Sequence, residues 1–158
     1  MSVIDVELAM KHLLAEPEDE ALIQAQLDAA EEASMQFLNR RFFVDQGALE
    51  SAKAETIQRT REARQVYASA IASADLPENA DIRCKLRESA RNTLAETYEL
   101  IDMDERGLVI NAAITAACLL KLGHLFANRE EVVAGTTVAE LPLASKSLLA
   151  PYRVKMGV

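Results

Sequence analysis

The stretch that decides the fold is Leu108-Val109-Ile110-Asn111-Ala112-Ala113-Ile114-Thr115-Ala116-Ala117-Cys118-Leu119-Leu120-Lys121-Leu122. Its apolar residues fall on nearly every side of a helix, and a helix that is apolar all round is buried all round. We therefore predict a helix from Glu105 to about Asn128 as the structural axis of the protein. The run is too short, and carries too many polar residues, to span a bilayer.

Outward from this helix, the composition favours an all-α fold. The chain has 158 residues, of which only 5 are glycine and 4 are proline, and these two residue types supply the tight turns that an all-β protein needs. A chain of this length can bury a sizeable core as one domain. We predict a single domain over residues 1–158, a small helical bundle with a long inserted helical hairpin, a C-terminal extended arm and a short helix.

Periodicity and end signals place the remaining helices. We predict them at residues 6–15 with Asp5 as N-cap, and at 18–41, 48–73, 78–101 and 144–150. The helix over 18–41 carries the buried stripe Ile23, Leu27, Ala30, Ser34 and Leu38. The two long helices form the hairpin, over residues 46–104. A β-prone arm over 129–143, and a short helix with a tail over 144–158, follow the axial helix.

The seam between the two long helices is narrow. On the second helix we expect an inward stripe of Ile82, Leu86, Ser89 or Ala90, Thr93, Thr97 or Tyr98, and Ile101. On the first helix the stripe is weaker and comprises Leu49, Ile57, Tyr67 and Ile71. Such a pair packs on itself or on a neighbouring subunit and is not a fold centre.

Charge and cysteine usage limit the class of protein. The chain has 17 basic and 25 acidic residues, a net charge of −8, whereas nucleic-acid binders usually carry a basic excess. Cys84 and Cys118 lack metal or redox spacing and indicate reduced, buried thiols in a cytosolic protein. The first residues show no basic region followed by an apolar run, so we expect no signal peptide and no membrane association.

The sequence contains no motif of enzyme catalysis. His12 and His124 have no partner at metal-ligand spacing, and the segment around Gly135 lacks the second glycine and the lysine of a phosphate-binding loop. Paired carboxylates such as Glu31 and Glu32 are adjacent, and adjacent helix positions do not face each other, so we expect them on the solvated surface. We therefore expect no enzyme: no catalytic residue, no metal site and no cofactor.

One charge pattern permits two interpretations. Arg83, Arg87 and Arg91 are four residues apart on the second long helix. In the favoured interpretation they pair with acidic neighbours such as Glu88 or Glu62. In the other they form a stripe that contacts phosphates or an acidic face of a partner.

The run Arg40-Arg41-Phe42-Phe43 is also open to two interpretations. It could anchor a partner, because arginine and aromatic residues dominate interface hot spots. Alternatively it is a helix C-terminus whose phenylalanines fold back into the core, which the pattern favours somewhat.

Two segments resemble the small head–tail connector (adaptor) proteins of tailed bacteriophages. At the front, residues 6–13, 18–23 and 29–32 resemble the opening helix pair of that family. At the back, residues 123–130 and 135–154 resemble its closing helix and arm. The back is more specific, because generic helix composition does not account for the order Asn128-Arg129-Glu130, Leu141-Pro142 and Leu148-Leu149-Ala150-Pro151-Tyr152-Arg153.

This resemblance implies a structural virion assembly protein. Members form a ring of identical subunits, twelvefold to match the portal, between the portal protein above and the next stopper or tail-completion protein below. Genomic DNA passes through the channel without specific binding, and the location is the head–tail interface of the virion after assembly in the host cytoplasm. Compact members cross from Arg41 to the core helix by a much shorter connection, so residues 46–104 look like an insertion.

The resemblance and the β-prone arm together predict a partner interface. We expect the arm to lie against a neighbouring subunit or the portal, for example by adding a strand. The interface residues expected are Arg129, Glu130, Val132, Val133, Thr136, Thr137, Val138, Glu140, Leu141, Tyr152 and Arg153.

The alternative function is a DNA-packaging or DNA-binding accessory protein of a phage. Such a protein needs a recognition helix with a basic face, and the arginine stripe at 83, 87 and 91 is the candidate that the sequence offers.

Overall fold

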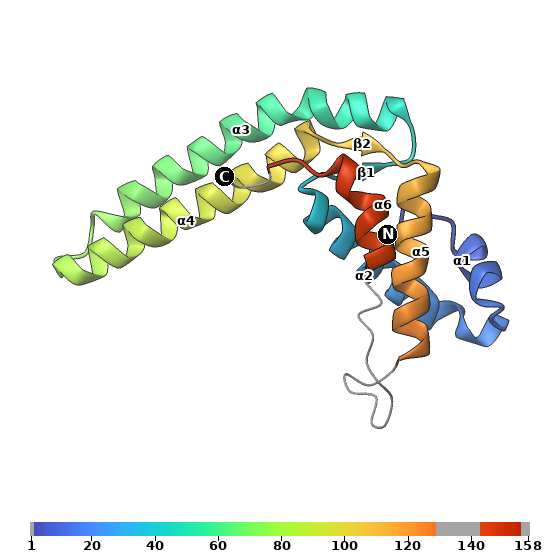
Figure 1. Ribbon diagram of the computed structural model, residues 1–158. Helices are drawn as coiled ribbons and strands as arrows, with labels where there is room; N and C mark the ends of the chain where they lie inside the picture. The colour runs from blue at the N-terminus through green and yellow to red at the C-terminus, as the bar shows by residue number, and fades with distance from the viewer. Residues whose placement is uncertain (1, 129–142, 156–158) are drawn as a thin grey trace. The chain divides into compact units, whose positions relative to one another are not determined.

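The computed structural model describes residues 2–128 and 143–155, and these residues are mostly helical (Figure 1). The chain divides into two compact units, one made of residues 1–45 and 108–158 and the other of residues 46–107. The predicted all-α class is confirmed, because the described residues form six α-helices and a single pair of two-residue strands.

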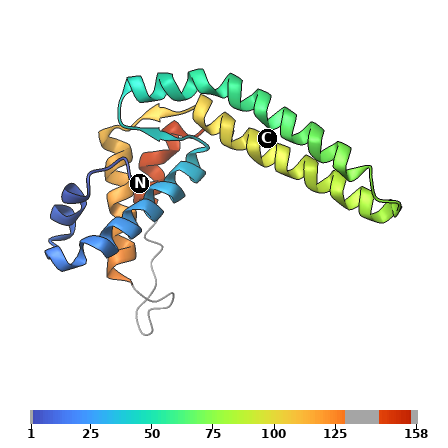
Figure 2. The same cartoon turned by 180° about the vertical axis from the view of Figure 1, so that it is seen from behind.

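The first unit is a bundle of helices packed around one apolar helix. Helix α5 contacts α2, α6 and α1, and α6 lies beside α5 in both Figure 1 and Figure 2. The prediction that the apolar run forms an axis is therefore confirmed for this unit. The bounds are α1 Val6–Leu13, α2 Glu20–Leu38, α5 Ala112–Ala127 and α6 Leu143–Leu149, with 3-10 turns at Pro17–Asp19 and Ala150–Tyr152.

Large aliphatic side chains fill the interior of this unit. The predicted stripe of α2 is buried along its whole length, from Ile23 to Leu38. Fully burying an aliphatic side chain of this size contributes about 1.5–3 kcal/mol. The largest fully buried aliphatic residues are Ile23, Leu27, Leu38, Ile114, Leu122 and Leu149.

Polar caps set the ends of these helices. The Asp5 carboxylate accepts a hydrogen bond from the amide of Glu7 at 3.0 Å, which confirms the predicted N-cap of α1. Helix α2 ends three residues earlier than predicted, because Asn39 adopts a left-handed conformation with φ 55°. Asparagine tolerates this conformation at helix C-termini better than most residues.

The predicted start of the axial helix at Glu105 is wrong. Helix α5 begins at Ala112, after the side chain of Asn111 caps it, and the preceding residues form strand β2 (Leu108–Val109). Strand β2 runs parallel to β1 (Phe42–Phe43). The amide of Leu108 donates to the carbonyl of Arg41 at 3.0 Å, and the amide of Ile110 donates to the carbonyl of Phe43 at 3.0 Å. This pairing joins two segments of the first unit that are far apart in sequence.

The second unit is an antiparallel helical hairpin. Its helices are α3 (Gln46–Ala74) and α4 (Ala80–Glu105), so the hairpin and its turn are as predicted, with helix ends shifted by one to four residues. The two helices lie side by side along their length in both views (Figures 1 and 2). The side chain of Asn79 caps α4 by accepting from the amides of Asp81 and Ile82.

The seam of the hairpin agrees with the prediction in part: Leu49, Ala90 and Ile101 are buried as expected. The residues buried along it are mostly small, namely Thr56, Ala63, Ala74 and Ala90, with Leu49, Ile101 and Met103 toward its base. Large residues expected to face inward are exposed instead: Ile82 is 50% and Leu86 42% exposed on α4, and Ile57 is 63% exposed on α3. Alanine and threonine form the buried seam, and the larger aliphatic side chains are left on the flanks of the hairpin.

Candidate partner-binding surfaces

Most of the predicted interface lies outside the described residues. This holds for the arm itself and for Arg129, Glu130, Val132, Val133, Thr136, Thr137, Val138, Glu140 and Leu141. The described members are Tyr152 and Arg153, at the end of the segment that follows α6.

The residues after α6 pair with the end of α2. The amide of Val154 donates to the carbonyl of Leu38 at 3.1 Å. In return, the side chain of Asn39 donates from Nδ2 to the carbonyl of Val154 at 2.9 Å. Asn39, whose left-handed conformation ends α2, therefore also binds the C-terminal segment through its side chain.

Both described interface candidates make contacts within the first unit. The guanidinium of Arg40 donates to the carbonyl of Tyr152 at 3.3 Å. The guanidinium of Arg153 lies over the ring of Phe37, 4.7 Å from its centroid, in the range of a cation–π interaction. The backbone of Tyr152 and the charge of Arg153 thus help to hold the segment on α2, a role that the sequence did not indicate.

The structure favours one of the two interpretations of the run from Arg40 to Phe43. Phe42 is buried, with 3% of its surface exposed, and Phe43 is half-buried. Both sit in strand β1, and Arg40 is used in the contact with the C-terminal segment. The phenylalanines therefore belong with the core, as the favoured interpretation had it.

A buried carboxylate holds the N-terminal segment on α2. Oε2 of Glu31 accepts from the amide of Val3, and Oε1 accepts from the amide of Ile4, each at 2.8 Å. Burial raises the pKa of Glu31, and the two amide hydrogen bonds oppose that shift without cancelling it, while nearby Asp28 adds to it. Sequence reasoning had placed Glu31 on a solvated face, because nothing local identifies its backbone partners.

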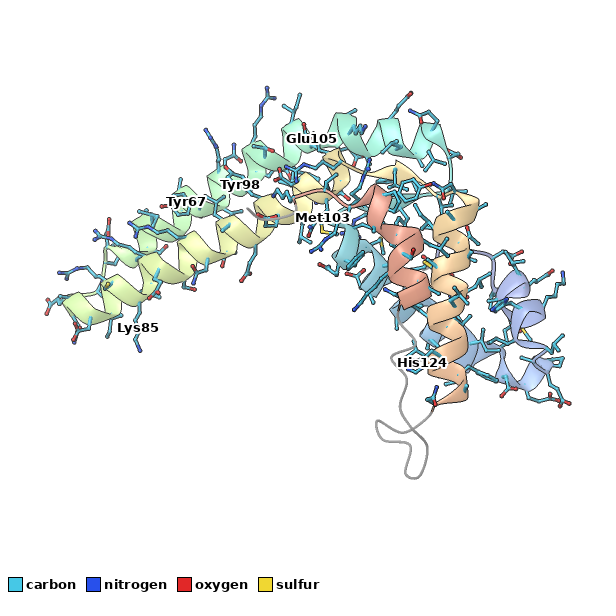
Figure 3. All side chains as sticks on the ribbon, viewed as in Figure 1. Tyr67, Lys85, Tyr98, Met103, Glu105 and His124 are labelled. Carbon is cyan, nitrogen blue, oxygen red and sulfur yellow. The ribbon has the colours of Figure 1, made fainter. Side chains whose placement is uncertain are left out.

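A groove of about 400 Å³ lies in the first unit, against α2, α5 and α6. Its floor is apolar, and its polar groups are two lysines, His124 and Ser145. Burial lowers the pKa of Lys121, and the neighbouring Lys146 lowers it further. The groove therefore combines an apolar surface with positive charge. Figure 3 shows His124 toward the C-terminal end of α5.

The arginine stripe serves mainly to close the hairpin turn. Arg83 donates from Nη1 to the carbonyls of Pro77 and Glu78 at 2.8 and 2.7 Å. Arg87 forms an ion pair with Asp75, with 2.6 Å between Nη2 and Oδ1. Arg91 is exposed. The favoured interpretation, pairing with acidic neighbours such as Glu88, Glu55 or Glu62, is confirmed in kind for Arg87, although its partner is Asp75. Arg83 bonds instead to backbone carbonyls of the turn.

The hairpin has two hollows on opposite sides of its seam. The first, of about 510 Å³, is mainly apolar, and residues contributing to it are Glu62, Val66, Ala70, Leu86, Ala90 and Thr93. The second, of about 810 Å³, carries charged side chains of both signs, and its charged lining residues are Arg61, Arg64, Glu99, Asp102 and Glu105. Consecutive helix residues are about 100° apart, so Glu62 and Arg64 flank buried Ala63 on opposite sides.

The two cysteines differ in burial. Cys118 is buried as predicted, and burial raises the pKa of its thiol to about 11 although it lies 3.5 Å from the hydroxyl of Ser34. Cys84 is exposed on α4, so the prediction of two buried thiols is wrong for this residue. It lies near the turn of the hairpin, on the flank away from the seam.

The described residues give no sign of a metal centre. Between residues 2–128 and 143–155, no three histidine, cysteine or acidic side chains gather in a way that could hold a metal ion. No helix in that part of the chain is both long enough and apolar enough to cross a membrane. The surfaces suited to function are therefore the two hollows of the hairpin and the groove of the first unit.

The comparisons with known proteins add no further assignment. No protein-family model matches the chain, and neither a curated protein nor a solved structure is significantly similar to it.

Proposed function

We propose that this protein is a head–tail connector of a tailed bacteriophage. In this role it forms a ring beneath the portal and joins the DNA-filled head to the tail or to a stopper protein. The order of residues at the two ends of the chain suggested this function, and one structural observation carries it further.

That observation concerns the two segments that resemble the connector family. They are separated by the whole hairpin in sequence, yet they belong to the same compact unit. Helix α2 packs on α5, and Val154 pairs with Leu38. A connector needs these parts in one body, because its opening helices must support the closing helix and the arm that follows it.

The place of the hairpin supports the same proposal. Its two ends adjoin β1 and β2, which pair with each other. A segment whose ends leave from neighbouring strands can be present or absent without rearranging the unit that carries it. The hairpin therefore fits an insertion into a smaller connector.

The alternative, a DNA-binding accessory protein, has less support. Two of the three arginines in its candidate recognition stripe bond to the turn of the hairpin. With a net charge of −8, the chain as a whole repels phosphates. A gel shift at low and moderate salt tests this alternative directly, and retention of DNA at moderate salt would favour it.

The decisive experiment combines the purified protein with the portal protein from the same genome. We expect electron microscopy to show a second ring stacked on the portal with matching rotational symmetry. A variant with residues 132–139 deleted is the matched comparison, since the arm is the predicted docking segment. Bare portals at a high excess of the intact protein would contradict the proposed function.

A further inference from the structure

The groove of the first unit carries positive charge without negative charge, in a chain that is acidic as a whole. The chain has 25 acidic residues, yet helices α5 and α6, which form two of the three walls, contain no aspartate or glutamate. Their two lysines, Lys121 and Lys146, both line the groove. Burial lowers the pKa of Lys121, and Lys146 lowers it further, as expected where two ammonium groups lie close together in a partly desolvated site.

The third wall, from α2, does not neutralise these lysines. It contributes three alanines and Phe37 to the groove. The acidic residues beside them on α2 bond elsewhere: Asp28 accepts from Gln24, Glu31 accepts from the amides of Val3 and Ile4, and Glu32 accepts from Gln36. Neither lysine forms an ion pair with a described residue. A ligand of this groove should therefore combine apolar groups with carboxylates.

The groove has the size for a short extended segment of polypeptide. Its α2 wall runs from Ala29 to Phe37, which is about 12 Å of helix. An extended chain advances about 3.3 Å per residue, so about four residues fit along this wall. The volume of about 400 Å³ lies within the usual range of ligand pockets.

The chain itself contains a segment of the required chemistry. This segment, residues 129–142, joins α5 to α6 and has three glutamates and one arginine, with aliphatic residues next to the glutamates. The residues concerned are Glu130, Glu131, Val132, Val133, Val138, Glu140 and Leu141. The segment therefore has an excess of carboxylates, whereas the groove has two ammonium groups.

The segment is also longer than its connection requires. Helices α5 and α6 pack against each other and run antiparallel (Figure 1), and antiparallel helices of this kind are joined by loops of about 2–5 residues. Residues 129–142 are about three times as many. The excess is available for contact with another chain, and in a connector the neighbouring subunit presents the same groove.

We propose that residues 129–142 of one copy of this chain bind the groove between α2, α5 and α6 of a second copy. The glutamates lie against Lys121 and Lys146, and the aliphatic side chains cover the apolar floor. Each copy contacts one neighbour through its segment and the other through its groove, so the contact is head-to-tail and closes into a ring. The choice of a neighbouring copy rests on the proposed connector function, whereas the chemistry of the occupant rests on the groove.

A synthetic peptide of residues 129–142 tests this contact on the full chain without a portal. Fluorescence anisotropy of the labelled peptide, with the chain at about 1 to 500 µM, measures the binding. We expect saturable binding that the groove variant, Lys121→Glu with Lys146→Glu, weakens at least about tenfold. The matched control, Lys53→Glu with Lys85→Glu, makes the same change in net charge at exposed positions of the hairpin and should bind like the unaltered chain.

A peptide in which the three glutamates are replaced by lysine gives the sharper result. It should bind the unaltered chain poorly and should regain binding to the groove variant, because the charges are again complementary. Lys146→Glu alone, at an exposed position, should weaken binding of the original peptide by a smaller factor. Circular dichroism and thermal melting establish that each variant is folded.

A further variant distinguishes the segment of a neighbour from the segment of the same copy. This arm variant of the full chain carries Glu130→Lys, Glu131→Lys and Glu140→Lys. We expect it to bind the original peptide like the unaltered chain. If each segment occupied the groove of its own copy, the unaltered chain would exclude the peptide and only the arm variant would bind it.

Three outcomes would overturn the proposal. They are absence of peptide binding over the whole concentration range, equal binding by a folded groove variant, and binding by the arm variant alone. Peptide binding as expected, together with bare portals in the electron microscope, would remove the connector function and keep this contact. Rings that stack on the portal equally well with the groove variant would remove only the contact.

Discussion

The two units of this protein bury different kinds of residue. In the first unit the interior is made of Leu and Ile side chains that are fully buried, such as Leu27 and Leu122. In the hairpin the seam is mostly alanine and threonine, while Ile57, Val66 and Leu86 are exposed. The first unit therefore contains the core that stabilises it, whereas several large aliphatic side chains of the hairpin remain exposed.

The same contrast appears in the polar contacts. In the first unit, Glu31 and Asn39 reach across to backbone groups that are distant in sequence. In the hairpin, Arg83 and Arg87 bond to the nearby turn, and Arg59 and Arg64 bond to Asp104 and Tyr98 on the other helix. The bonds of the first unit join several segments, whereas those of the hairpin join only its two helices and their turn. Substitutions that compare matched residues in the two units measure this difference.

The largest effect is expected for Leu122→Ala in the core of the first unit. Leu122 has no exposed surface, so its truncation removes buried contacts and leaves a cavity, at a cost of about 2–5 kcal/mol in the free energy of unfolding. The matched change in the hairpin, Leu86→Ala, should cost less than about 1 kcal/mol, because Leu86 is 42% exposed. Urea unfolding followed by circular dichroism compares the two. Equal losses would contradict the contrast between the units.

The next effect concerns the base of the hairpin against its tip. Asp104 is paired with Arg59 and has a side chain that is 8% exposed. Asp104→Asn removes the charge from a largely buried pair, and we expect a loss of about 2 kcal/mol.

The control for that change is Asp75→Asn at the tip. Both side chains of the pair between Asp75 and Arg87 are 47% exposed, so solvent screens the attraction and the loss should be below about 1 kcal/mol. Thermal unfolding of the two variants gives the comparison, and a tip variant as unstable as the base variant would show that exposure does not decide the outcome.

A smaller effect is expected where Glu31 holds the N-terminal segment. In Glu31→Gln the amide replaces one of two acceptors with a donor that faces an amide N–H, so we expect a loss of about 1 kcal/mol at neutral pH. The exposed neighbour provides the control, since Glu32→Gln should change stability by less than about 0.5 kcal/mol. Equal stability of the two variants would show that the amide bonds to Val3 and Ile4 contribute little.

The pH dependence of stability gives an independent test of Glu31. Its pKa in the folded protein is raised, chiefly by burial, so the folded state retains the proton at pH values where the unfolded chain has lost it. The contribution of this group is therefore fully present below the ordinary glutamate pKa and is lost as the pH rises through the raised value. Unfolding measured across this range should show a decline that is absent from Glu31→Gln and retained in Glu32→Gln.

The two cysteines are expected to differ clearly in their reactivity, and labelling the exposed one should have the smallest effect on stability. Cys118 is buried with a pKa raised to about 11, so it is protonated and shielded at pH 7.5, whereas Cys84 is exposed. Iodoacetamide should label Cys84 at least about 100-fold faster, without loss of folding. Mass spectrometry of the peptides measures both rates. Comparable rates in the folded protein would indicate that the first unit opens readily.

Local signals in the sequence were sufficient for most of the helical architecture. Asp5 precedes an apolar stripe and caps α1, as N-cap chemistry requires. The stripe from Ile23 to Leu38 repeats at the helical period and is buried. The run that ends at Leu122 is apolar on nearly every side and became the axis of its unit. These features depend on a few consecutive residues, which is the range over which periodicity and capping act.

Features that depend on distant residues were not foreseen. The strand pair of Phe42 with Leu108 requires two segments to meet, and neither contains a strand-length pattern. The partners of Glu31 are backbone amides near the N-terminus, and such groups carry no sequence signature. Tyr152 and Arg153 help to hold the C-terminal segment on α2, a role that the sequence did not indicate, and their place in a partner interface stays a prediction.

By itself, then, the sequence determined the class of the fold, the position of the hairpin and the helix that forms the core of the first unit. Only the tertiary structure decided which side of each long helix is buried. Of the stripe that periodicity predicted on α4, Ala90 and Ile101 are buried in the seam, whereas Ile82 and Leu86 are exposed. The physical reason is that two helices approach closest where their side chains are smallest. The larger side chains are displaced to the flanks of the hairpin, where they are exposed.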